Sequence, residues 1–350
     1  MNFKIGNKTI GENFGCFIVA EMSGNHNGDI RKAIEILNVA KEIGVDAVKL
    51  QTYSADSITL KSKASDFLLN EKSPWSEYKT LWELYDKAST PPEWHETLFN
   101  EAKKIDLEVF STPFDELAVD LLDELGVAAY KIASPEINHV PLIKKVATKN
   151  KPIILSAGVA DEADIQLALK TIRENASNPH IALLQCNSAY PSPYEDTNLK
   201  TICDIEKKFG VIPGFSDHTI GIHCAIGSVA LGSKIIEKHL CLDGDDTVDS
   251  FFSLTPSEFK IMISQIREVE DAIGSVSYEI SPSAIDSIKG RRSLYVSENI
   301  KTGEVFSIKN VQCVRPSYGL HPKHYDFIIG KKAKVDLKKG DRLSLDDVDE

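Results

Sequence analysis

The chain has 350 residues, of which 42% are hydrophobic and 26% charged, and its formal net charge is −12. This length can bury a large core, as one large domain or as a large domain with a small one. The negative charge argues against nucleic acid as a partner, and no apolar run is long enough to cross a bilayer. A small anionic substrate is compatible with it, because a local cluster of cations can override the global sign.

The six cysteines are widely spaced and form no Cys-x-x-Cys pair. Most of them fall inside apolar segments that read as strands or helices. This pattern favours reduced, buried thiols in a cytoplasmic protein.

Taken in chain order, the first 275 residues alternate short apolar runs with segments of helical periodicity. Residues 1–15 predict a hairpin. Eight strands are then predicted, at 16–22, 47–53, 107–113, 129–135, 152–158, 181–187, 211–217 and 234–240. The clearest helices are predicted at 30–44, 116–126, 161–175 and 256–274.

Eight strands alternating with helices match an α/β fold of the (β/α)8 TIM-barrel type in number and length. A doubly wound open sheet is the alternative, but it usually has fewer strands and a glycine-rich phosphate turn, which this sequence lacks. One connection, residues 54–95, is unusually long. At a loop that follows a barrel strand it would lie over the catalytic face, so we expect a lid or a substrate wall.

The pattern changes after Gly274, where short strand-like runs alternate with turns. We therefore predict a barrel domain at residues 1–275, a linker at 276–290 and a small β-rich domain at 291–350.

Polar residues occur at the carboxyl end of every predicted strand. Side chains two residues apart share one face of a strand, and the active site of a TIM barrel lies at these strand ends. The polar residues in question are Glu21, Lys49, Gln51, Ser111, Thr112, Lys131, Ser134, Glu136, Ser156, Gln185, Asn187, Ser188, Tyr190, Ser216, Asp217, His218, Glu237 and His239. Burying lysine or glutamate is costly unless partners compensate the charge. Polar ends on all eight strands therefore predict one shared site.

The residue types divide this site into two parts. One part contains two lysines and four hydroxyl groups, which suit a phosphate or a carboxylate: Lys49, Lys131, Ser134, Ser156, Ser188 and Ser216. The other part contains His218 and His239, on adjacent strands, which are candidate ligands of one divalent ion. Two imidazoles leave coordination positions for water or substrate, as in an open Lewis-acid site.

These residues also have plainer interpretations. A histidine at a strand end is often a hydrogen-bonded structural residue, and Lys131 could equally be a salt-bridged core lysine. His26, in the turn "SGNHNG", is either a site residue or part of an ordinary turn. From the residues alone, the sequence predicts a barrel enzyme that binds an anionic substrate. The alternatives are a Schiff-base aldolase or lyase with Lys131 as nucleophile and a non-catalytic carbohydrate-binding protein.

Several longer motifs carry a resemblance to a known family. They are "AEMSGNHNGD", "AVKLQTY", "FSTPFD", "YKIASPEI", "ILSAG", "SDHTIG", "EKHL" and "RRSLYV". Together, in order and over nearly the whole chain, they resemble the sialic acid synthase family of metal-dependent barrel enzymes. The resemblance implies condensation of phosphoenolpyruvate with an N-acetylated amino sugar, with cleavage of a C–O bond and release of phosphate. It also implies that residues 291–350 form an antifreeze-like (SAF) domain, which reaches over the partner subunit's barrel in a domain-swapped homodimer.

Within this family, the pattern is most similar to that of the pseudaminic acid synthases. The segments that indicate this are "TLWELYDKASTPPEWHETLF", "VDSFFSLTPSEF" and "RPSYGLHPKHYD". The resemblance then implies 2,4-diacetamido-2,4,6-trideoxy-L-altropyranose as the sugar. N-acetylneuraminate and legionaminate synthases are the alternatives within the family.

The resemblance also implies roles for individual residues. His218 and His239 would hold a divalent ion, Mn²⁺ or Mg²⁺. The phosphate of phosphoenolpyruvate would be bound by Lys131, Ser134, Ser156, Ser188 and Ser216, with Lys49 and Gln51 near its reacting end. Sugar hydroxyls would be held by Glu21 and Asp249, and the pocket completed by Glu136 and Tyr190. The partner subunit's Arg315 would hold an N-acyl group.

Overall fold

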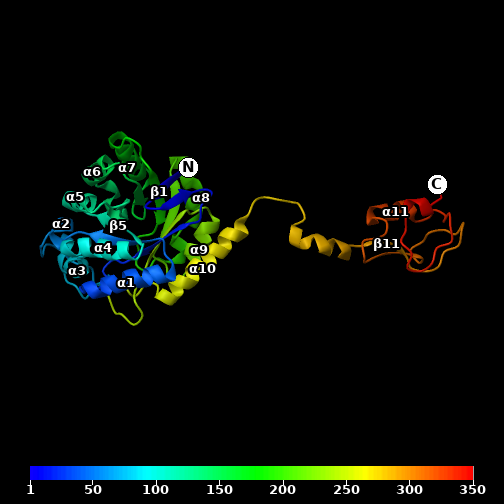
Figure 1. The fold of residues 1–350 in the computed structure, drawn as a ribbon, viewed down its shortest axis with the longest axis horizontal. Coiled ribbons are helices and arrows are strands. Elements are labelled where there is room, and N and C mark those ends of the chain that lie inside the picture. Colours follow the sequence, from blue (N-terminus) through cyan, green and yellow to red (C-terminus); the bar gives the residue numbers. More distant parts are fainter. Residues whose placement is uncertain (350) are drawn as a thin grey trace. The chain divides into compact units, whose positions relative to one another are not determined.

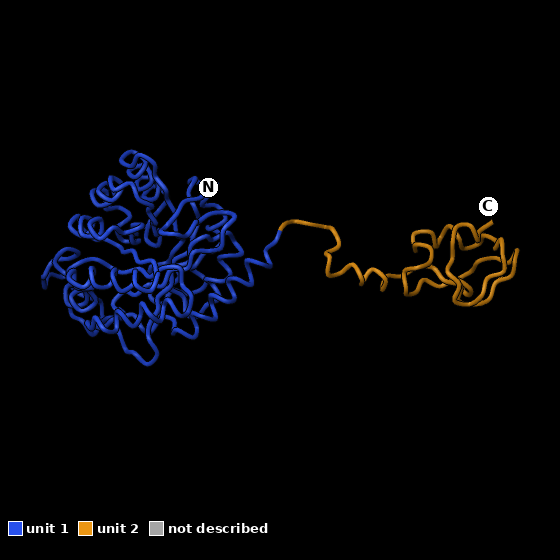
Figure 2. The backbone as a smooth tube through the Cα atoms, viewed as in Figure 1, with its two compact units in different colours: residues 1–274 blue, residues 275–350 orange. Residues whose placement is uncertain are grey.

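The computed structural model describes residues 1–349 and divides into two compact units, residues 1–274 and residues 275–350 (Figure 2). Glu350, the last residue of the predicted C-terminal domain, lies outside the described residues. Each unit is described by itself below.

Unit 1 is a closed barrel of eight parallel strands with helices around it (Figure 1). The strands are β3 (Phe17–Glu21), β4 (Ala47–Thr52), β5 (Glu108–Pro113), β6 (Tyr130–Ile132), β7 (Ile153–Ser156), β8 (Ile181–Cys186), β9 (Ile212–Asp217) and β10 (Ile235–His239). They follow one another around the barrel, and β10 closes it by pairing with β3. The predicted TIM barrel is confirmed, and every strand lies within the segment predicted for it.

The outer layer consists of eight helices, and four of them begin where the sequence supplies a capping side chain. They are α1 (Ile30–Ile43), α4 (His95–Lys104), α5 (Glu116–Glu124), α6 (Val140–Thr148), α7 (Glu162–Asn175), α8 (Ile202–Phe209), α9 (His223–Ala230) and α10 (Pro256–Ile273). Asp29 caps α1 by accepting a hydrogen bond from Arg31 N, and Thr255 with Glu258 forms a capping box at α10. Such caps satisfy backbone N–H groups that have no partner within the helix.

Strand alternation separates the barrel interior from the helix layer. On β3, Phe17 and Val19 belong to the apolar cluster that includes the N-terminal hairpin, whereas Ile18 and Ala20 pack in the cluster formed with α1 and α10. Because successive side chains point to opposite faces, the last inward position of β3 is Glu21. The same alternation fixes which polar residues of the other strands face inward.

The N-terminal hairpin covers the amino ends of the barrel strands. It consists of β1 (Asn2–Ile5) and β2 (Lys8–Gly11), paired antiparallel. Phe3 stacks on His180, just before β8, with ring centroids 5.8 Å apart, and Lys8 forms an ion pair of 3.2 Å with Asp46, just before β4. This end of the barrel is therefore closed, and any substrate has to enter from the opposite end.

The long connection after β4 forms an irregular layer with two short helices, α2 (Ala55–Ile58) and α3 (Leu81–Ala88). Its 3-10 turns are η1 (Ser65–Phe67) and η2 (Pro92–Trp94). Further 3-10 turns in barrel loops are η3 (Ser134–Asn138), η4 (Tyr194–Asp196) and η5 (Leu199–Thr201). Of these three, η3 follows β6 closely, whereas η4 and η5 lie in the connection between β8 and α8.

Unit 2 is small and has its own apolar core. It contains the antiparallel strands β11 (Ser293–Val296) and β12 (Val311–Val314) and the helix α11 (Tyr325–Ile328). Its 3-10 segments are η6 (Pro282–Gly290), η7 (Pro322–His324) and η8 (Leu345–Asp347). Its core includes Leu294, Phe306 and Ile328, each fully buried.

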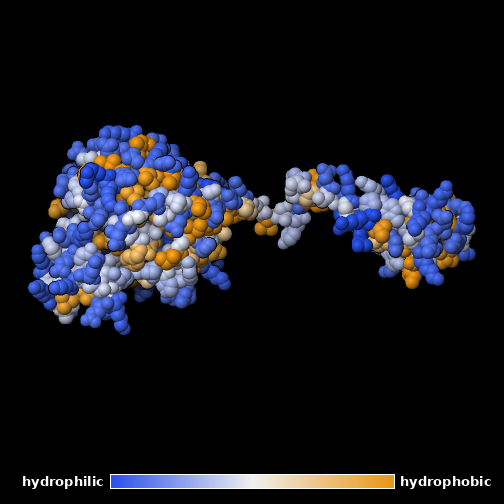
Figure 3. Space-filling view, turned by 90° about the horizontal axis from the view of Figure 1, so that it is seen from below, coloured by the Kyte–Doolittle hydropathy of each residue, from blue (hydrophilic) through white to orange (hydrophobic). Residues whose placement is uncertain are grey.

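The surface of each unit is mainly hydrophilic on the face drawn in Figure 3, with scattered hydrophobic areas. Among residues 1–349, no helix combines the length and the apolar character needed to cross a membrane.

Gly214 in β9 lies where the barrel leaves no room for a side chain. A Cβ atom there would press on Leu184 Cδ2 and lie 2.8 Å from the backbone oxygen of Ile235. We expect Gly214→Ala to lower the free energy of unfolding by about 1–3 kcal/mol, because the neighbouring strands have to shift. Urea denaturation followed by circular dichroism measures this difference.

Gly227→Ala is the matched control, since a Cβ atom at this helical position meets nothing closer than 3.7 Å. It should raise the free energy of unfolding by about 0.5–1 kcal/mol, because alanine favours a helix over glycine. Equal stabilities of the two variants would contradict the close packing of β9 between β8 and β10.

Candidate active site

The carboxyl ends of the barrel strands surround one cavity of about 420 Å³. Twelve of the fourteen predicted site residues line it: Glu21, Lys49, Gln51, Lys131, Ser134, Glu136, Ser156, Tyr190, Ser216, His218, His239 and Asp249. Residues from distant parts of the sequence therefore share one space, as the strand-end pattern predicts.

The remaining two predicted residues lie elsewhere. Ser188 Oγ is buried beside the cavity and lies, like Ser134 Oγ, against Gly158. Arg315 is exposed on unit 2, one residue after β12. Its role toward a substrate stays a prediction.

Four charged side chains form the centre of the site. Lys49 Nζ lies 2.5 Å from Glu21 Oε2 and 3.8 Å from Glu237 Oε1, and Lys131 Nζ lies 3.7 Å from the same Glu237 oxygen. Lys131 also donates a hydrogen bond of 2.7 Å to Ser156 Oγ. None of the four charged residues is more than 5% exposed. This cluster, the charge quartet, contains two positive and two negative groups inside the barrel.

Strand register brings the quartet together. Glu21 of β3 is paired with Lys49 of β4, and Glu237 of β10 is paired with Ser216 of β9. Ser216 Oγ donates a hydrogen bond of 3.0 Å to Glu237 Oε1. Glu237 reaches inward between the two lysines, so it holds both ammonium groups on the same side of the cavity.

The pKa values of the quartet follow from burial and from these contacts. Burial alone would lower the pKa of Lys49, but Glu21 and Glu237 outweigh it, and the pKa is raised. Burial alone would raise the pKa of Glu237, but Lys131 and Lys49 outweigh it, and the pKa is lowered. Burial lowers the pKa of Lys131 despite the attraction of Glu237. Lys49 and Glu237 are therefore held charged, and Lys131 is the weaker base of the two lysines.

The two predicted metal ligands both line the cavity, with their rings packed edge to face. The ring centroids of His218 and His239 are 5.4 Å apart. His218 Nδ1 lies 2.8 Å from Asn187 O, and because a carbonyl only accepts, Nδ1 carries the proton and Nε2 has a free lone pair. His239 Nδ1 is buried, has no hydrogen-bond partner within residues 1–349, and lies 3.8 Å from Asp249 Oδ2.

Burial lowers the pKa of His218 to about 4 and also lowers the pKa of His239. Both rings are therefore neutral near pH 7, which is the form that binds metal ions. No group of three or more histidine, cysteine or carboxylate side chains arranged for a metal occurs in the described part of the chain. A buried imidazole nitrogen without a hydrogen-bond partner, beside a second histidine with a free ring nitrogen, fits an ion that takes its other ligands from water and substrate.

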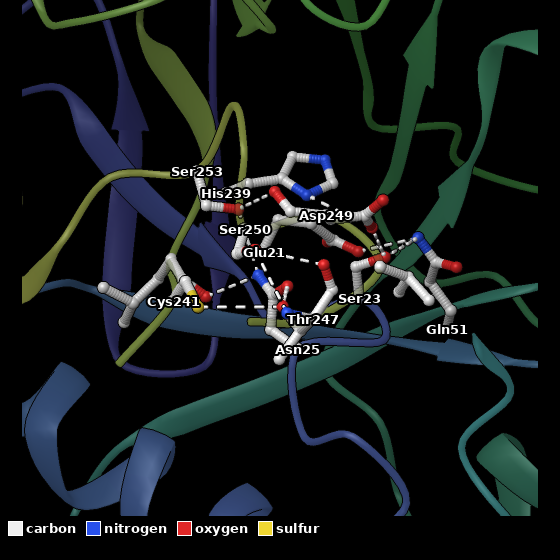
Figure 4. A network of polar contacts seen from close by, with 12 residues as sticks. Glu21, Ser23, Asn25, Gln51, His239, Cys241, Thr247, Asp249, Ser250 and Ser253 are labelled. Atoms are coloured by element: carbon white, nitrogen blue, oxygen red, sulfur yellow. Dashed lines mark hydrogen bonds and ion pairs between the residues drawn. The ribbon is translucent and has the colours of Figure 1, made fainter. Parts of the chain in front are cut away.

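The turn that follows β3 supports Glu21 and Asp249 (Figure 4). Ser23 Oγ donates a hydrogen bond of 2.5 Å to Asp249 Oδ2. Gln51 Nε2 donates to Glu21 Oε1 at 2.9 Å and to Ser23 Oγ at 3.2 Å. These contacts join Glu21 to Asp249, which lies in the loop after β10, through two neutral side chains.

Asn25 and Gly24 of the same turn fix that loop in place. Asn25 Nδ2 donates to Leu240 O at 2.8 Å, and Asn25 Oδ1 accepts from Thr247 Oγ1 at 2.6 Å. A Cβ atom on Gly24 would lie 2.6 Å from Val248 Cγ2 and 3.1 Å from the backbone of Ala88. A small residue is required here because the turn packs directly against two other segments.

His26 is a structural residue, which decides between the two interpretations of the turn. Its Nδ1 accepts a hydrogen bond of 3.1 Å from Gly28 N, so its Nε2 carries the proton and donates to Thr90 Oγ1 at 3.1 Å. Its ring also packs edge-on against Trp94, 5.3 Å between centroids. His26 is fully buried and does not line the cavity.

Comparison with known proteins identifies the family. Residues 36–278 match the model of the NeuB family, and residues 291–349 match the SAF domain. The chain belongs to the NeuB family. The resemblance to sialic acid synthases is thereby confirmed, and so is the SAF domain of the predicted fold.

Individual members of this family are similar over almost their whole length. A pseudaminic acid synthase of Helicobacter pylori is 44% identical over 95% of this chain and 97% of its own. An N,N'-diacetyllegionaminic acid synthase of Campylobacter jejuni is 38% identical over 93% and 98%. The crystal structure of the spore coat polysaccharide biosynthesis protein SpsE of Bacillus subtilis is 31% identical, covers 100% of this chain and 99% of its own, and has a TM-score of 0.66.

Two features of this NeuB-family site were missed by sequence reasoning. Glu237 was noted at an inward position but given no role, although its spacing of two residues from His239 signals a shared face. Trp75 gave no signal beyond its place in the long connection, yet its Nε1 donates a hydrogen bond of 2.7 Å to Val248 O. Trp75 is one of the large apolar side chains that form the apolar wall of the cavity: Ile58, Trp75, Leu84, Phe114 and Val248.

Glu136 makes the stability of unit 1 depend on pH. Burial raises the pKa of its carboxyl group from 4.5 to about 7. The folded state therefore binds more protons than the unfolded state between these values, and stability is lost as the pH rises from about 4.5 to about 7. We expect Glu136→Gln to show a smaller loss of melting temperature between pH 5 and pH 7.5 than the wild type. Differential scanning calorimetry at closely spaced pH values measures the two slopes.

The matched control is Glu35→Gln, which removes an exposed carboxylate from α1. It should leave the slope of the wild type unchanged. Parallel slopes for Glu136→Gln and the wild type would show that Glu136 is ionised in the folded state throughout this range.

Proposed function

We propose that this NeuB-family chain is a pseudaminic acid synthase. It condenses phosphoenolpyruvate with 2,4-diacetamido-2,4,6-trideoxy-L-altropyranose to give a nine-carbon 2-keto sugar acid and phosphate. The observation that carries the proposal is the meeting of two buried lysines and two neutral histidines in one cavity, in a chain 44% identical to a pseudaminic acid synthase. N-acetylneuraminate and legionaminate synthases are the alternatives, and the legionaminic acid synthase compared above is less similar, at 38%.

The phosphate end of phosphoenolpyruvate is assigned to the Lys131 side of the cavity. Lys131 Nζ is fixed by Ser156 Oγ at 2.7 Å, and Ser134 and Ser216 line the same space. A cation with hydroxyl donors around it binds phosphate oxygens and stabilises the charge that grows as phosphate leaves. Lys49, on the Glu21 side, is then available for the carboxylate.

Charge balance supports a divalent ion in this site. The two lysines of the quartet are already matched by two glutamates, so the quartet alone offers no excess positive charge to a highly anionic substrate. His218, through Nε2, and His239 are the residues that would hold Mn²⁺ or Mg²⁺. When bound, such an ion supplies Lewis-acid polarisation of the sugar's aldehyde oxygen.

The sugar is assigned to the region between the charge quartet and the apolar wall. Glu21 and Asp249 accept hydrogen bonds from hydroxyl groups on one side. Ile58, Trp75, Leu84, Phe114 and Val248 offer carbon surface on the other side. A deoxy sugar with acetamido methyl groups presents matching apolar surface, whereas a hydroxymethyl end would lose hydrogen bonds there.

Glu136 is assigned to proton transfer. Its carboxyl group has a pKa of about 7 and its Oε2 atom is buried without a hydrogen-bond partner within residues 1–349. An acid with this pKa both gives and takes a proton near neutral pH. The reaction needs such a group because C3 of phosphoenolpyruvate attacks the aldehyde carbon, water adds at C2, and the C–O bond to phosphate then breaks.

A phosphate-release assay with a panel of sugars tests the proposal. The purified enzyme is given phosphoenolpyruvate and Mn²⁺ with the altropyranose, with the legionaminate precursor or with N-acetylmannosamine. We expect kcat/KM for the altropyranose to exceed that for N-acetylmannosamine by about 10–200-fold, because the apolar wall discriminates by carbon surface. Removal of divalent ions by a chelator should abolish the release of phosphate.

A preference for another sugar of the panel would replace the pseudaminate assignment by one of the two alternatives. The lowered pKa of Lys131 is the one observation that favours a Schiff-base aldolase. That function predicts a covalent adduct on Lys131 after borohydride trapping with a keto acid, and it predicts no release of phosphate. The synthase predicts phosphate and no adduct.

We also propose that the enzyme is a domain-swapped homodimer in which the partner's Arg315 holds an N-acyl group. The matched SAF domain and the exposed position of Arg315 support this. Light scattering should give twice the chain mass of 38.7 kDa. Arg315→Ala should raise KM for the sugar by about tenfold or more with KM for phosphoenolpyruvate unchanged, as expected for loss of a hydrogen bond from a charged group. A monomer with full activity would contradict both parts.

We place the enzyme in the cytoplasm. The six cysteines are all free thiols in the described structure, which supports a reducing compartment.

A further inference from the structure

A buried ion pair lies directly behind the two histidines, on the outer face of the same strand ends. Lys238 Nζ lies 2.9 Å from Asp217 Oδ2, and both side chains are completely buried. Lys238 also donates to Thr219 O at 2.7 Å. Asp217 Oδ1 accepts hydrogen bonds from Thr219 N at 2.9 Å and from Thr219 Oγ1 at 2.7 Å.

The position of this pair follows from strand alternation. Asp217 immediately precedes His218 and Lys238 immediately precedes His239, so each charged residue points outward where its neighbour points into the cavity. The register pairs Lys238 of β10 with Asp217 of β9. The ion pair therefore joins the two strand ends that carry the histidines.

The contacts with Thr219 extend this link beyond the strand. After β9 the chain continues through His218 and Thr219. Lys238 donates to the backbone oxygen of Thr219, and Asp217 accepts from its backbone N–H and its hydroxyl group. On the cavity side, His218 Nδ1 donates to Asn187 O at 2.8 Å, and His218 O accepts from Ser192 N at 2.9 Å. The His218 backbone and ring are thus fixed from two sides, and the side facing away from the cavity depends on the ion pair.

Stability alone does not account for such a pair. Two buried charges can often be replaced by apolar residues without loss of stability, because desolvation offsets their attraction. The Asp217–Lys238 pair differs from the charge quartet, since neither of its residues lines the cavity. Its carboxylate and ammonium groups bind each other and Thr219.

We propose that Asp217 and Lys238 are positioning residues that set the separation and orientation of His218 and His239 and thereby the affinity of the site for a divalent ion. The inference rests on the proposed two-histidine ion site and is independent of the sugar. Neither residue touches the ion or the substrate.

The double variant Asp217→Asn/Lys238→Met tests this inference, because it removes both charges and leaves none unpaired in the interior. Mn²⁺ is titrated into the protein without phosphoenolpyruvate or sugar, and free Mn²⁺ is measured by electron paramagnetic resonance. We expect affinity to fall by about 10–100-fold, as is typical when residues supporting metal ligands are replaced. His239→Ala provides the reference for a lost ligand.

The matched control is Arg267→Met, which breaks an ion pair near the amino ends of the strands. Arg267 binds Glu270 at 2.9 Å and Asp46 at 3.3 Å. It should lower the melting temperature and leave Mn²⁺ affinity unchanged. An equal loss of affinity in this control would show that general destabilisation is responsible, and the proposal would be wrong.

A second readout needs no metal. In protein with ¹⁵N-labelled histidine, the His218 ring should show a proton on Nδ1, because it donates to Asn187 O. The double variant should show a mixture of ring tautomers for His218, assigned with His218→Gln. Thr219→Val, which removes only the hydroxyl bond to Asp217, should give smaller changes in the same direction and carries the test if the double variant does not fold.

Wild-type Mn²⁺ affinity together with an unchanged His218 tautomer in the folded variants would overturn the inference. Failure of the proposed function has a different signature. It leaves Mn²⁺ binding intact in the wild type while no sugar of the panel releases phosphate.

Discussion

The structure depends on placing four charges, Glu21, Lys49, Lys131 and Glu237, inside a barrel where water does not compensate them. Their mutual contacts of 2.5–3.8 Å make this tolerable, but each partner has to come from a different strand. Losing any one would leave the buried charges unbalanced, which is far more costly than losing an exposed ion pair. Closure of the barrel and its exact register are therefore conditions for the site as much as for the fold.

The alternation of eight strands with helices predicted the barrel from the sequence, and strand-end polarity predicted most of the cavity. Period-two alternation tells which side of a strand a residue occupies, and in a closed barrel all inward ends meet. It does not tell which residues touch. Glu237 was seen as inward, yet its position between Lys49 and Lys131 depends on how β10 is registered against β3, more than 200 residues earlier. That information is not local, so the role of Glu237 emerged only with the structure.

Loops were predicted less well, for a related physical reason. The turn after β3 was noticed for its asparagines, glycines and His26, but its function is to hold the loop after β10, more than 200 residues away, through Asn25 and Gly24. His26 drew attention because histidine often marks chemistry, whereas here it supports the turn. Trp75 lies in a connection without periodicity, so its contact with Val248 had no sequence signal.

The inward residues of β9 and β10 line the cavity, whereas their outward neighbours form an ion pair behind it. In the cavity, two neutral imidazoles lie beside the charge quartet. The outward residues do not line the cavity, so an ion pair between them does not compete with a substrate for contacts. Because both sets alternate along the same two strands, the geometry of the histidines cannot be separated from the contacts behind them. If the proposed ion is held by only two protein nitrogens, the placement of those two nitrogens depends on this support more than it would in a site with three or four ligands.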